Sequence, residues 1–184
     1  PSALSASLNF PGEIVSIAPA TLADDGQSMS GIADTRGVPE GGRGLVRRLK
    51  DRVVDVIEKT CVLEDQPAVA CIEWIDPLMA AGNWVPELVH LAGGKNLFGQ
   101  AGKHSPWMEW EQLVAGDPDV IVALPCGFDL ARTRLEMAAR FGKAEWTRLR
   151  AVKNGRVYLT DGTRCFNRLG PRLGESVPIL AETP

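Results

Sequence analysis

The sequence lacks several features that would assign a function class at once. No stretch approaches the ~20 consecutive apolar residues that a membrane-spanning helix needs, so we expect no membrane insertion. Neither GxxxxGK[ST] nor a GxGxxG that follows a strand occurs, which excludes the usual phosphate-binding loops. The four cysteines form no CxxC pair and have no histidine at metal-finger spacing, and a disulfide framework is not expected in a chain of 184 residues.

An excess of either charge is also missing. Lysine and arginine together number 20 and aspartate and glutamate 23, which gives a net charge of −3. This balance leaves no general attraction for nucleic acid or for an anionic membrane surface, and we expect neither as a partner. Hydrophobic residues make up 45% and charged residues 23% of the chain, as in ordinary globular proteins.

The stretch 68–94, AVACIEWIDPLMAAGNWVPELVHLAGG, predicts one strand–loop–helix unit. The apolar run 69–72 is long enough for a buried strand but too short for a helix, and Pro77 cannot donate to a strand ladder. Apolar residues recur at helical spacing over 84–92, and glycines end that segment. The loop between strand and helix lies at the carboxyl end of the strand, where parallel α/β sheets bind ligands.

The remaining pattern alternates strands with helices. We expect strands at 96–98, 119–124 and 155–159, and helices at 109–115, 130–141, 145–152 and 167–182. In helix 130–141 the buried residues should be Leu135, Ala138 and Ala139, and Pro178 should kink or split the last helix. Alternation of this kind predicts an α/β fold, a Rossmann-like parallel sheet with helices on both faces.

The N-terminal part is harder to assign. A strand is expected at 13–17 and a weakly periodic helix at 22–33, followed by a turn-rich segment, 37–44. From Leu45 onward apolar residues recur at i, i+4 and i+8, which predicts an amphipathic helix roughly 30 Å long. Such a helix fits a strut that connects two lobes, and its periodicity fits an ordinary sheet-covering helix equally well.

Candidate ligand-binding residues lie in the three loops that follow predicted strands, 73–84, 125–129 and 160–168. Their indole, phenyl and polar side chains would meet at one edge of the sheet and would suit a large, flat, amphipathic ligand. The alternative is that Trp74 and Trp84 belong to the core, since tryptophan is usually mostly buried.

The sequence gives a poor catalytic signal. Cys126 stands between a predicted strand and a helix, where a helix N-terminus can lower the pKa of a thiol. His90 and His104 are the two histidines of the chain, and nothing in the sequence ties either one to Cys126. A thiol enzyme that uses Cys126 is therefore kept only as an alternative.

Four segments together resemble a known family. EWIDPLMAAGNWVPELVHLAGGKNLFG, WEQLVAGDPDVIVALPCGFD, AVKNGRVYLTDG and FNRLGPRL are similar to segments of the iron-siderophore/cobalamin class of ABC-transporter substrate-binding proteins, cobalamin-binding members above all. That family has two Rossmann-like lobes joined by a long helix. The resemblance implies a remnant of the first lobe at 1–44, a connecting helix at 45–67 and the second α/β lobe at 68–184. Most of the first lobe would then be absent, which would weaken binding unless another chain supplied the missing wall.

The resemblance also implies a set of ligand-binding residues and no catalytic or metal-binding ones. The implied residues are Glu73, Trp74, Trp84, Ser105, Trp107, Cys126, Gly127, Phe128, Phe166, Asn167 and Arg168. Transport members of the family carry an acidic residue near the FNRLGPRL segment that engages the permease. Asn167 followed by Arg168 stands there in this chain, which leaves docking to an ABC permease open.

The expected function is therefore non-catalytic binding of a corrinoid such as cobalamin, or of a related tetrapyrrole or iron chelate, for an ABC importer. No covalently bound cofactor is expected. The alternative is a soluble intracellular binder of the same ligands. No signal peptide is visible, but the first residue is Pro1 rather than Met, so the expected location is periplasmic or extracytoplasmic if a leader precedes this chain and cytoplasmic otherwise.

Overall fold

The structure is a computed structural model that describes residues 16–183. Its centre is a five-stranded sheet made of β1 (Ala68–Trp74), β2 (Met79–Ala80), β3 (Lys95–Asn96), β4 (Val120–Ala123) and β5 (Val157–Leu159). The strand order is β2-β1-β4-β5, and β3 also pairs with β1. The strands expected at 96–98, 119–124 and 155–159 are confirmed within one or two residues, and β2 was not anticipated.

Parallel pairing brings the strand ends together. β4 runs parallel to β1, with Cys71 opposite Val122, and β5 runs parallel to β4. The other edge of β1 is shared: its start pairs in parallel with β3, and its end pairs antiparallel with β2. The carboxyl ends of β1, β4 and β5 therefore lie at one edge of the sheet, as the sequence predicted.

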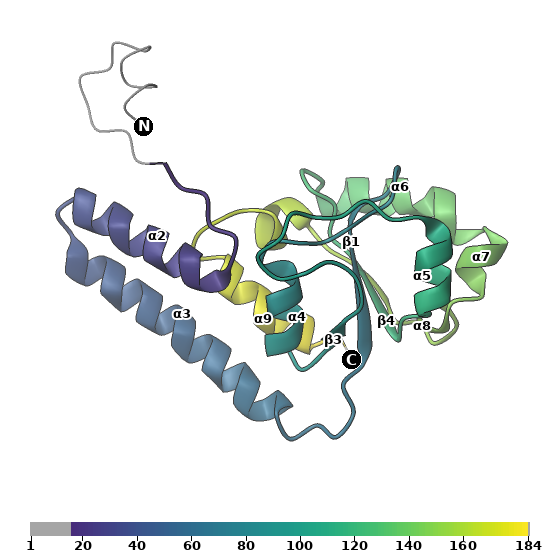
Figure 1. Cartoon of the computed structure of the whole chain (residues 1–184), viewed down its shortest axis with the longest axis horizontal. Helices are drawn as coiled ribbons and strands as arrows, with labels where there is room; N and C mark the ends of the chain where they lie inside the picture. The colour runs from purple at the N-terminus through teal and green to yellow at the C-terminus, as the bar shows by residue number, and fades with distance from the viewer. Residues whose placement is uncertain (1–15, 184) are drawn as a thin grey trace, which may run out of the picture.

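Helices cover both faces of the sheet (Figure 1). One face carries α3 (Pro39–Thr60), α4 (Val85–Leu91) and α9 (Leu173–Ala181), and the other carries α5 (Trp110–Gly116), α6 (Leu130–Phe141), α7 (Ala144–Thr147) and α8 (Arg150–Lys153). A further helix, α2 (Leu22–Thr35), packs on α3, and a π-helical turn, η1 (Gly162–Phe166), follows β5. The α/β fold with helices on both faces is confirmed.

The two faces have separate hydrophobic cores because successive strand residues point in opposite directions. Cys71 and Val122 belong to the core under α3, α4 and α9, and the expectation that Cys71 is a buried hydrophobe is met. Ile72 and Ile121 belong to the core under α5 to α8. Burying two such layers is what fixes the sheet and the loops at its edge.

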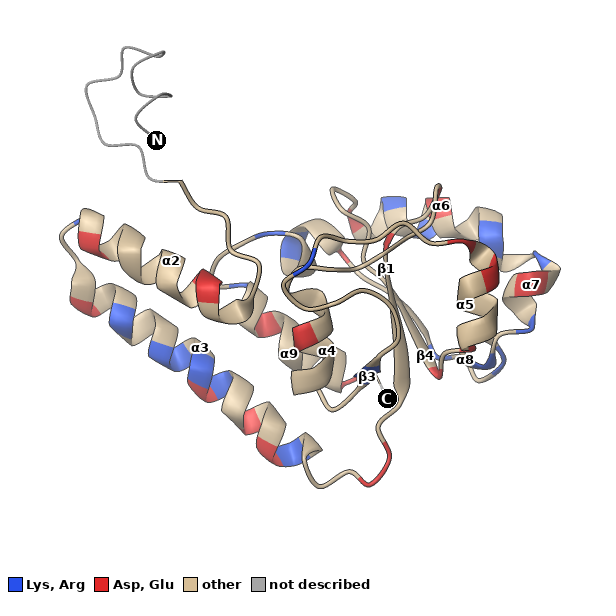
Figure 2. Cartoon of the chain, in the orientation of Figure 1, with Lys and Arg blue, Asp and Glu red and all other residues tan. Residues whose placement is uncertain are grey.

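Helix α3 begins earlier and ends earlier than the sequence indicated. The segment 37–44 was expected to be turn, but the helix starts at Pro39 and ends at Thr60, so the bounds 45–67 were wrong. Pro39 suits a first helical turn, where its missing N–H would have had no partner. Gly42 is buried against Ala33 of α2 and leaves no room for a Cβ, which explains a glycine inside the helix. In Figure 2, Lys, Arg, Asp and Glu are interspersed along α3, as its exposed positions require.

Three other expectations need correction. In α6 the buried residues are Thr133 and Met137, whereas Leu135, Ala138 and Ala139 are exposed. The buried Thr133 hydroxyl donates to the Asp129 carbonyl at 2.8 Å and lies 3.2 Å from the Thr160 carbonyl after β5. The last helix begins at Leu173 rather than at residue 167, because 162–166 forms η1, and it continues through Pro178 without splitting.

Two expectations concern the N-terminal part. Helix 22–33 is confirmed as α2, which opens with a capping box in which Thr21 and Asp24 satisfy each other's backbone amides. The strand expected at 13–17 falls mostly outside the described residues, and Ser16 and Ile17 are not in a strand. Across residues 16–183, no helix is both long enough and apolar enough to span a membrane.

Candidate functional site

The loops that follow β1, β4 and β5 are fastened to one another at the carboxyl edge of the sheet. The Cys126 amide donates to the Glu73 carbonyl at 3.1 Å, which ties the β4 loop to the end of β1. The Asn167 side-chain amide donates to the Leu124 carbonyl at 2.7 Å, which ties the end of η1 to β4. These hydrogen bonds bring predicted site residues from all three loops to one place.

An aromatic pair lies at this edge. The rings of Trp74 and Phe128 are tilted against each other with centroids 5.2 Å apart. The Arg132 guanidinium lies over the Phe128 ring, 3.9 Å from its centroid. Phe128 is buried and Trp74 is half-buried, so the indole is the part of this stack that a ligand could contact.

Glu73 is a half-buried carboxylate held by a neighbouring loop. Ser105, itself buried, donates its hydroxyl to Glu73 Oε2 at 2.9 Å and accepts from the Gly82 amide at 3.1 Å. Burial raises the pKa of Glu73, and the hydrogen bonds from Ser105 and the backbone and the nearby His104 offset only part of that rise. Ser105 therefore acts as the link between the 104–107 loop and the end of β1.

Trp84 and Phe166, both predicted to contact the ligand, hold the loops together in the structure. The Trp84 indole N–H donates to the Phe166 carbonyl at 2.7 Å, which connects the start of α4 to η1. The Phe166 side chain is fully buried in the core under α4 and α9. Trp84 is half-buried and packs against the same core, which is the core role that the sequence left open for it.

Asn167 also has a structural role. Its side chain is a hydrogen-bond donor to a backbone carbonyl, and a carboxylate at this position would place two acceptors against each other. An acidic docking residue at position 167 is therefore incompatible with this packing of η1 on β4.

Beside these loops lies an open depression with a volume of about 750 Å³. It is lined by residues that follow β4 and β5, namely Gly127, Asp129, Arg132, Asp161, Thr163, Arg164, Arg168 and Arg172. Among the ion pairs of the described residues, Arg132 pairs with Glu136, but Arg164, Arg168 and Arg172 have no carboxylate partner. The depression thus carries three arginines without a carboxylate partner in the described range, together with Asp129 and Asp161, and it adjoins the Phe128–Trp74 pair through Arg132.

Cys126 does not have the environment of a reactive nucleophile. Its thiol is exposed, but partial burial and the neighbouring Glu73 raise its pKa, and Arg168 offsets only part of that rise. The following helix therefore does not lower the pKa of this thiol, which a position between a strand and a helix could have allowed. His104 Nδ1 lies 2.9 Å from the Ser105 carbonyl, and no side-chain hydrogen bond joins either histidine to Cys126 within residues 16–183. No cluster of three or more potential metal ligands occurs in that range.

Trp107 lies apart from the other predicted residues. Its backbone pairs with Met79 at the β2 edge, and its side chain is 63% exposed. It lines two shallow depressions with residues such as Leu78 and Met108, and none of the other predicted site residues lines either one.

Sequence reasoning missed Arg132 and Arg172 as site residues. Arg164 belongs to the loop 160–168, which the sequence had already selected as a candidate. Arg132 and Arg172 belong to segments read as helix, so only the packing of α6 and α9 beside the loops reveals them.

Comparisons with known proteins agree with this geometry. A family model described as periplasmic binding protein matches residues 28–163. An ABC transporter substrate-binding protein of Listeria monocytogenes EGD-e has a TM-score of 0.82 at 16% identity, over 99% of this chain and 70% of that one. IsdE of S. aureus complexed with heme has a TM-score of 0.79 at 18% identity, over 98% and 70%.

A third similar structure is the periplasmic vitamin B12 binding protein BtuF of Vibrio cholerae. Its TM-score is 0.75 at 20% identity, over 100% of this chain and 69% of that one. A search of curated proteins found no match. Identities this low show a shared fold, so the chemistry of the site has to be argued from the residues of this chain.

Proposed function

Because this chain belongs to the periplasmic binding protein family, we propose that it captures a tetrapyrrole or iron chelate, with a corrinoid such as cobalamin first among them, and delivers it to an ABC importer. The resemblance drawn from the sequence is confirmed by the family match and by the fold of heme- and vitamin B12-binding neighbours. Members of this family bind solutes and are not enzymes, in agreement with the poor catalytic signal at Cys126.

The observation that carries this proposal is the pairing of an aromatic face with an arginine-lined depression. A macrocycle would lie with its apolar face against Trp74, which Phe128 supports from behind. Its carboxylate, phosphate or amide edge would meet Arg164, Arg168 and Arg172, whose fork-shaped guanidinium groups bond such oxygens in pairs. Glu73, Cys126 and Gly127 would complete the rim, and Ser105 would hold Glu73 from behind.

The test is a titration of the purified chain with cyanocobalamin, hemin and a ferric hydroxamate siderophore, followed by tryptophan emission and by calorimetry. We expect saturable binding of at least one of them, with quenching of Trp74. An absence of heat and of quenching with all three would contradict the proposal.

Matched variants locate the site. Arg168→Ala removes an exposed guanidinium from the depression, and we expect it to weaken binding by roughly tenfold, the effect of one charged hydrogen bond. Arg148→Ala removes an exposed guanidinium near α8, beside the amino end of β4, and should leave the affinity unchanged. Equal losses in both variants would point to a general charge effect and away from this site.

A protein that delivers a solute to an ABC importer works outside the cytoplasm. Fractionation of cells that express the whole gene should recover it in the periplasmic or lipoprotein fraction, as for other members of the family. Recovery in the cytosol alone would contradict the transport role while leaving ligand binding to the titration above.

A further inference from the structure

The turn between η1 and α9, residues 168–172, carries two arginines of the depression, Arg168 and Arg172. Four of its five residues are exposed, and Gly170 in the middle is half-buried. Among the described residues, the Gly170 amide is the one backbone amide of this turn that donates a hydrogen bond, and its acceptor is Asp25 Oδ1 at 2.9 Å. The Gly170 carbonyl accepts the first amide of α9 at 3.0 Å. Gly170 is therefore the point at which the turn is fastened.

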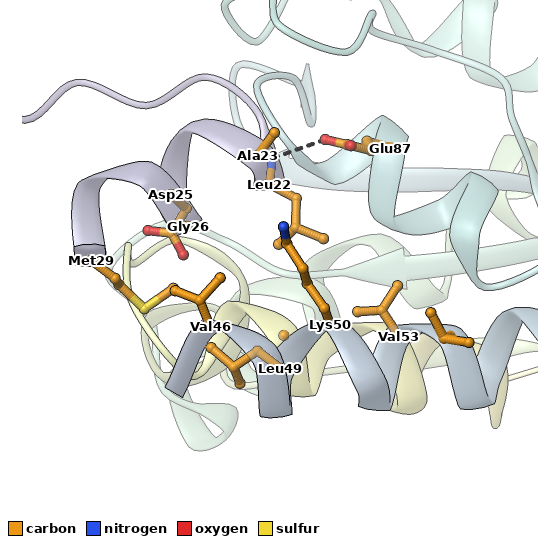
Figure 3. A pocket seen from close by; sticks show the side chains of 12 residues that line it. Leu22, Ala23, Asp25, Gly26, Met29, Val46, Leu49, Lys50, Val53 and Glu87 are labelled. Carbon is orange, nitrogen blue, oxygen red and sulfur yellow. Dashed lines mark hydrogen bonds between the residues drawn. The ribbon is translucent and has the colours of Figure 1, made fainter. Parts of the chain in front are cut away.

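The acceptor comes from a distant part of the sequence. Asp25 belongs to α2, 145 positions away from Gly170, and is only 2% exposed. It borders a pocket of about 300 Å³ between α2 and α3 (Figure 3). The walls of this pocket are aliphatic and are formed mainly by Leu22, Met29, Val46, Leu49 and Val53. The open space removes packing contacts from one side of α2, which leaves the hydrogen bond of Asp25 as a specific link between this helix and the turn.

A carboxylate is a costly acceptor in this position. The second oxygen of Asp25, Oδ2, is buried and has no hydrogen-bond partner among the described residues. Burial also raises the pKa of Asp25, because the environment disfavours its negative charge. A buried polar atom without a partner lowers stability. Local costs of this kind are typical of residues that serve a functional site.

We propose that Asp25 is a positioning residue for the ligand site: by holding Gly170, it presents Arg168 and Arg172 together to the anionic edge of a ligand. This inference rests on the function proposed above. Without the hydrogen bond the turn would be less ordered, and a ligand would have to order it at a cost in affinity. Helix α2 contributes no residue to the depression, yet it becomes part of the binding machinery through this one contact.

The test uses sodium pyrophosphate as the probe, because it engages the arginines without a macrocycle. The wild type, Asp25→Ala and Asp25→Asn are titrated while the arginine side-chain Nε signals are followed by NMR. We expect Asp25→Ala to weaken binding by roughly fivefold to tenfold, since the Gly170 amide loses its acceptor. Asp25→Asn keeps an acceptor oxygen and should bind within about twofold of the wild type.

Thr21→Ala is the control for a general loosening of α2. The Thr21 hydroxyl caps this helix by accepting the Asp24 amide at 3.1 Å, so its loss weakens α2 and leaves the hydrogen bond between Asp25 and Gly170 in place. We expect its pyrophosphate affinity to stay within about twofold of the wild type. An unchanged affinity in Asp25→Ala, or an equal loss in Thr21→Ala or in Asp25→Asn, would overturn the proposal. So would a wild type that does not bind pyrophosphate.

A second measurement needs no variant of Asp25. Coupling between two sites is reciprocal, so an anion that binds the ordered turn also strengthens the attachment of α2. Hydrogen exchange of the Gly170 amide and of the α2 amides should therefore be slower in the wild type with pyrophosphate than without it. Unchanged exchange at both places would overturn the proposal even if Asp25→Ala does not fold. A chain that shows these effects but binds no macrocycle would contradict the proposed function and still support the positioning role of Asp25.

Discussion

Single residues in this protein hold together the loops at the carboxyl edge of the sheet. Ser105 is the clearest case, since its hydroxyl serves both the Gly82 amide and the Glu73 carboxylate in a buried position. Trp84 and Asn167 do the same for η1 through their contacts with the Phe166 and Leu124 carbonyls. The residues that shape the site are therefore partly different from those a ligand would touch.

The first prediction concerns Ser105→Ala. The change removes the hydroxyl that accepts from the Gly82 amide and donates to the Glu73 carboxylate, and we expect a loss of about 2 kcal/mol in the free energy of unfolding. Urea denaturation measures it. Ser28→Ala is the matched control, because the Ser28 hydroxyl bonds only a carbonyl within its own helix and its loss should cost little. Equal stabilities of the two variants would show that Ser105 is not a link.

A second prediction at this scale concerns pH. Burial raises the pKa of Glu73 above its unfolded-state value, so the folded protein holds this proton more tightly and ionisation costs stability. The cost is absent below the unfolded-state pKa, grows as pH rises to the folded-state pKa, and is constant above it.

Glu73→Gln removes this titration and keeps an acceptor for Ser105. We expect its stability relative to the wild type to increase with pH from about 4 upward and then to level off. Urea denaturation at several pH values measures the difference, in which the raised pKa of Asp25 cancels because both proteins share it. A difference that stays flat across the series, or that decreases with pH, would contradict the pKa direction.

Among the elements, η1 depends on the close approach of its backbone at Gly162 to the backbone of the loop after β4. A Cβ at Gly162 would lie 2.7 Å from the Leu124 carbonyl oxygen and still closer to that of Pro125, so η1 packs here against the β4 loop without a side chain between them. We expect Gly162→Ala to lose about 2–3 kcal/mol in unfolding free energy through overpacking. Gly142→Ala, at an open helix end with nothing near its Cβ, should change stability by less than about 1 kcal/mol.

Circular dichroism during thermal unfolding measures both glycine variants. The outcome also bears on binding, since displacement of η1 moves Arg164 and Arg168 together. A Gly162→Ala protein as stable as Gly142→Ala would show that the two loops are free to separate.

The elements also show what sequence reasoning can and cannot supply. Strand periodicity placed β1, β4 and β5, and parallel pairing then placed their loops at one edge, because that step needs only the chain direction. The contacts between Ser105 and Glu73 and between Trp84 and Phe166 join residues far apart in sequence, so no local pattern contains them. Glycines in α3 were taken for a turn because their role, close packing of Gly42 on α2, is tertiary.

At the scale of the whole molecule, α2 is the element least anchored to the sheet. Its buried residues are Asp25 and Ala33 alone, whereas every residue of β4 is buried. Besides its packing on α3, it is fastened by the Leu22 amide to Glu87 on α4 and by Asp25 to the Gly170 amide. The pocket between α2 and α3 removes further packing from this interface.

The last prediction follows from that anchoring. Because α2 has few buried contacts, its amides should exchange through local opening at a free energy below that of global unfolding, while the β1 and β4 amides exchange only near the global value. Glu87→Ala removes the acceptor of the Leu22 amide and should speed exchange in α2 by roughly fivefold to tenfold without changing β4. Glu111→Ala, an exposed glutamate on α5 across the sheet, should leave α2 unchanged. Hydrogen exchange followed by mass spectrometry compares the three proteins. Uniform protection from α2 through β4 would contradict the prediction, because it would mean that α2 unfolds only together with the sheet. The pocket beneath α2 would then open only when the whole chain unfolds.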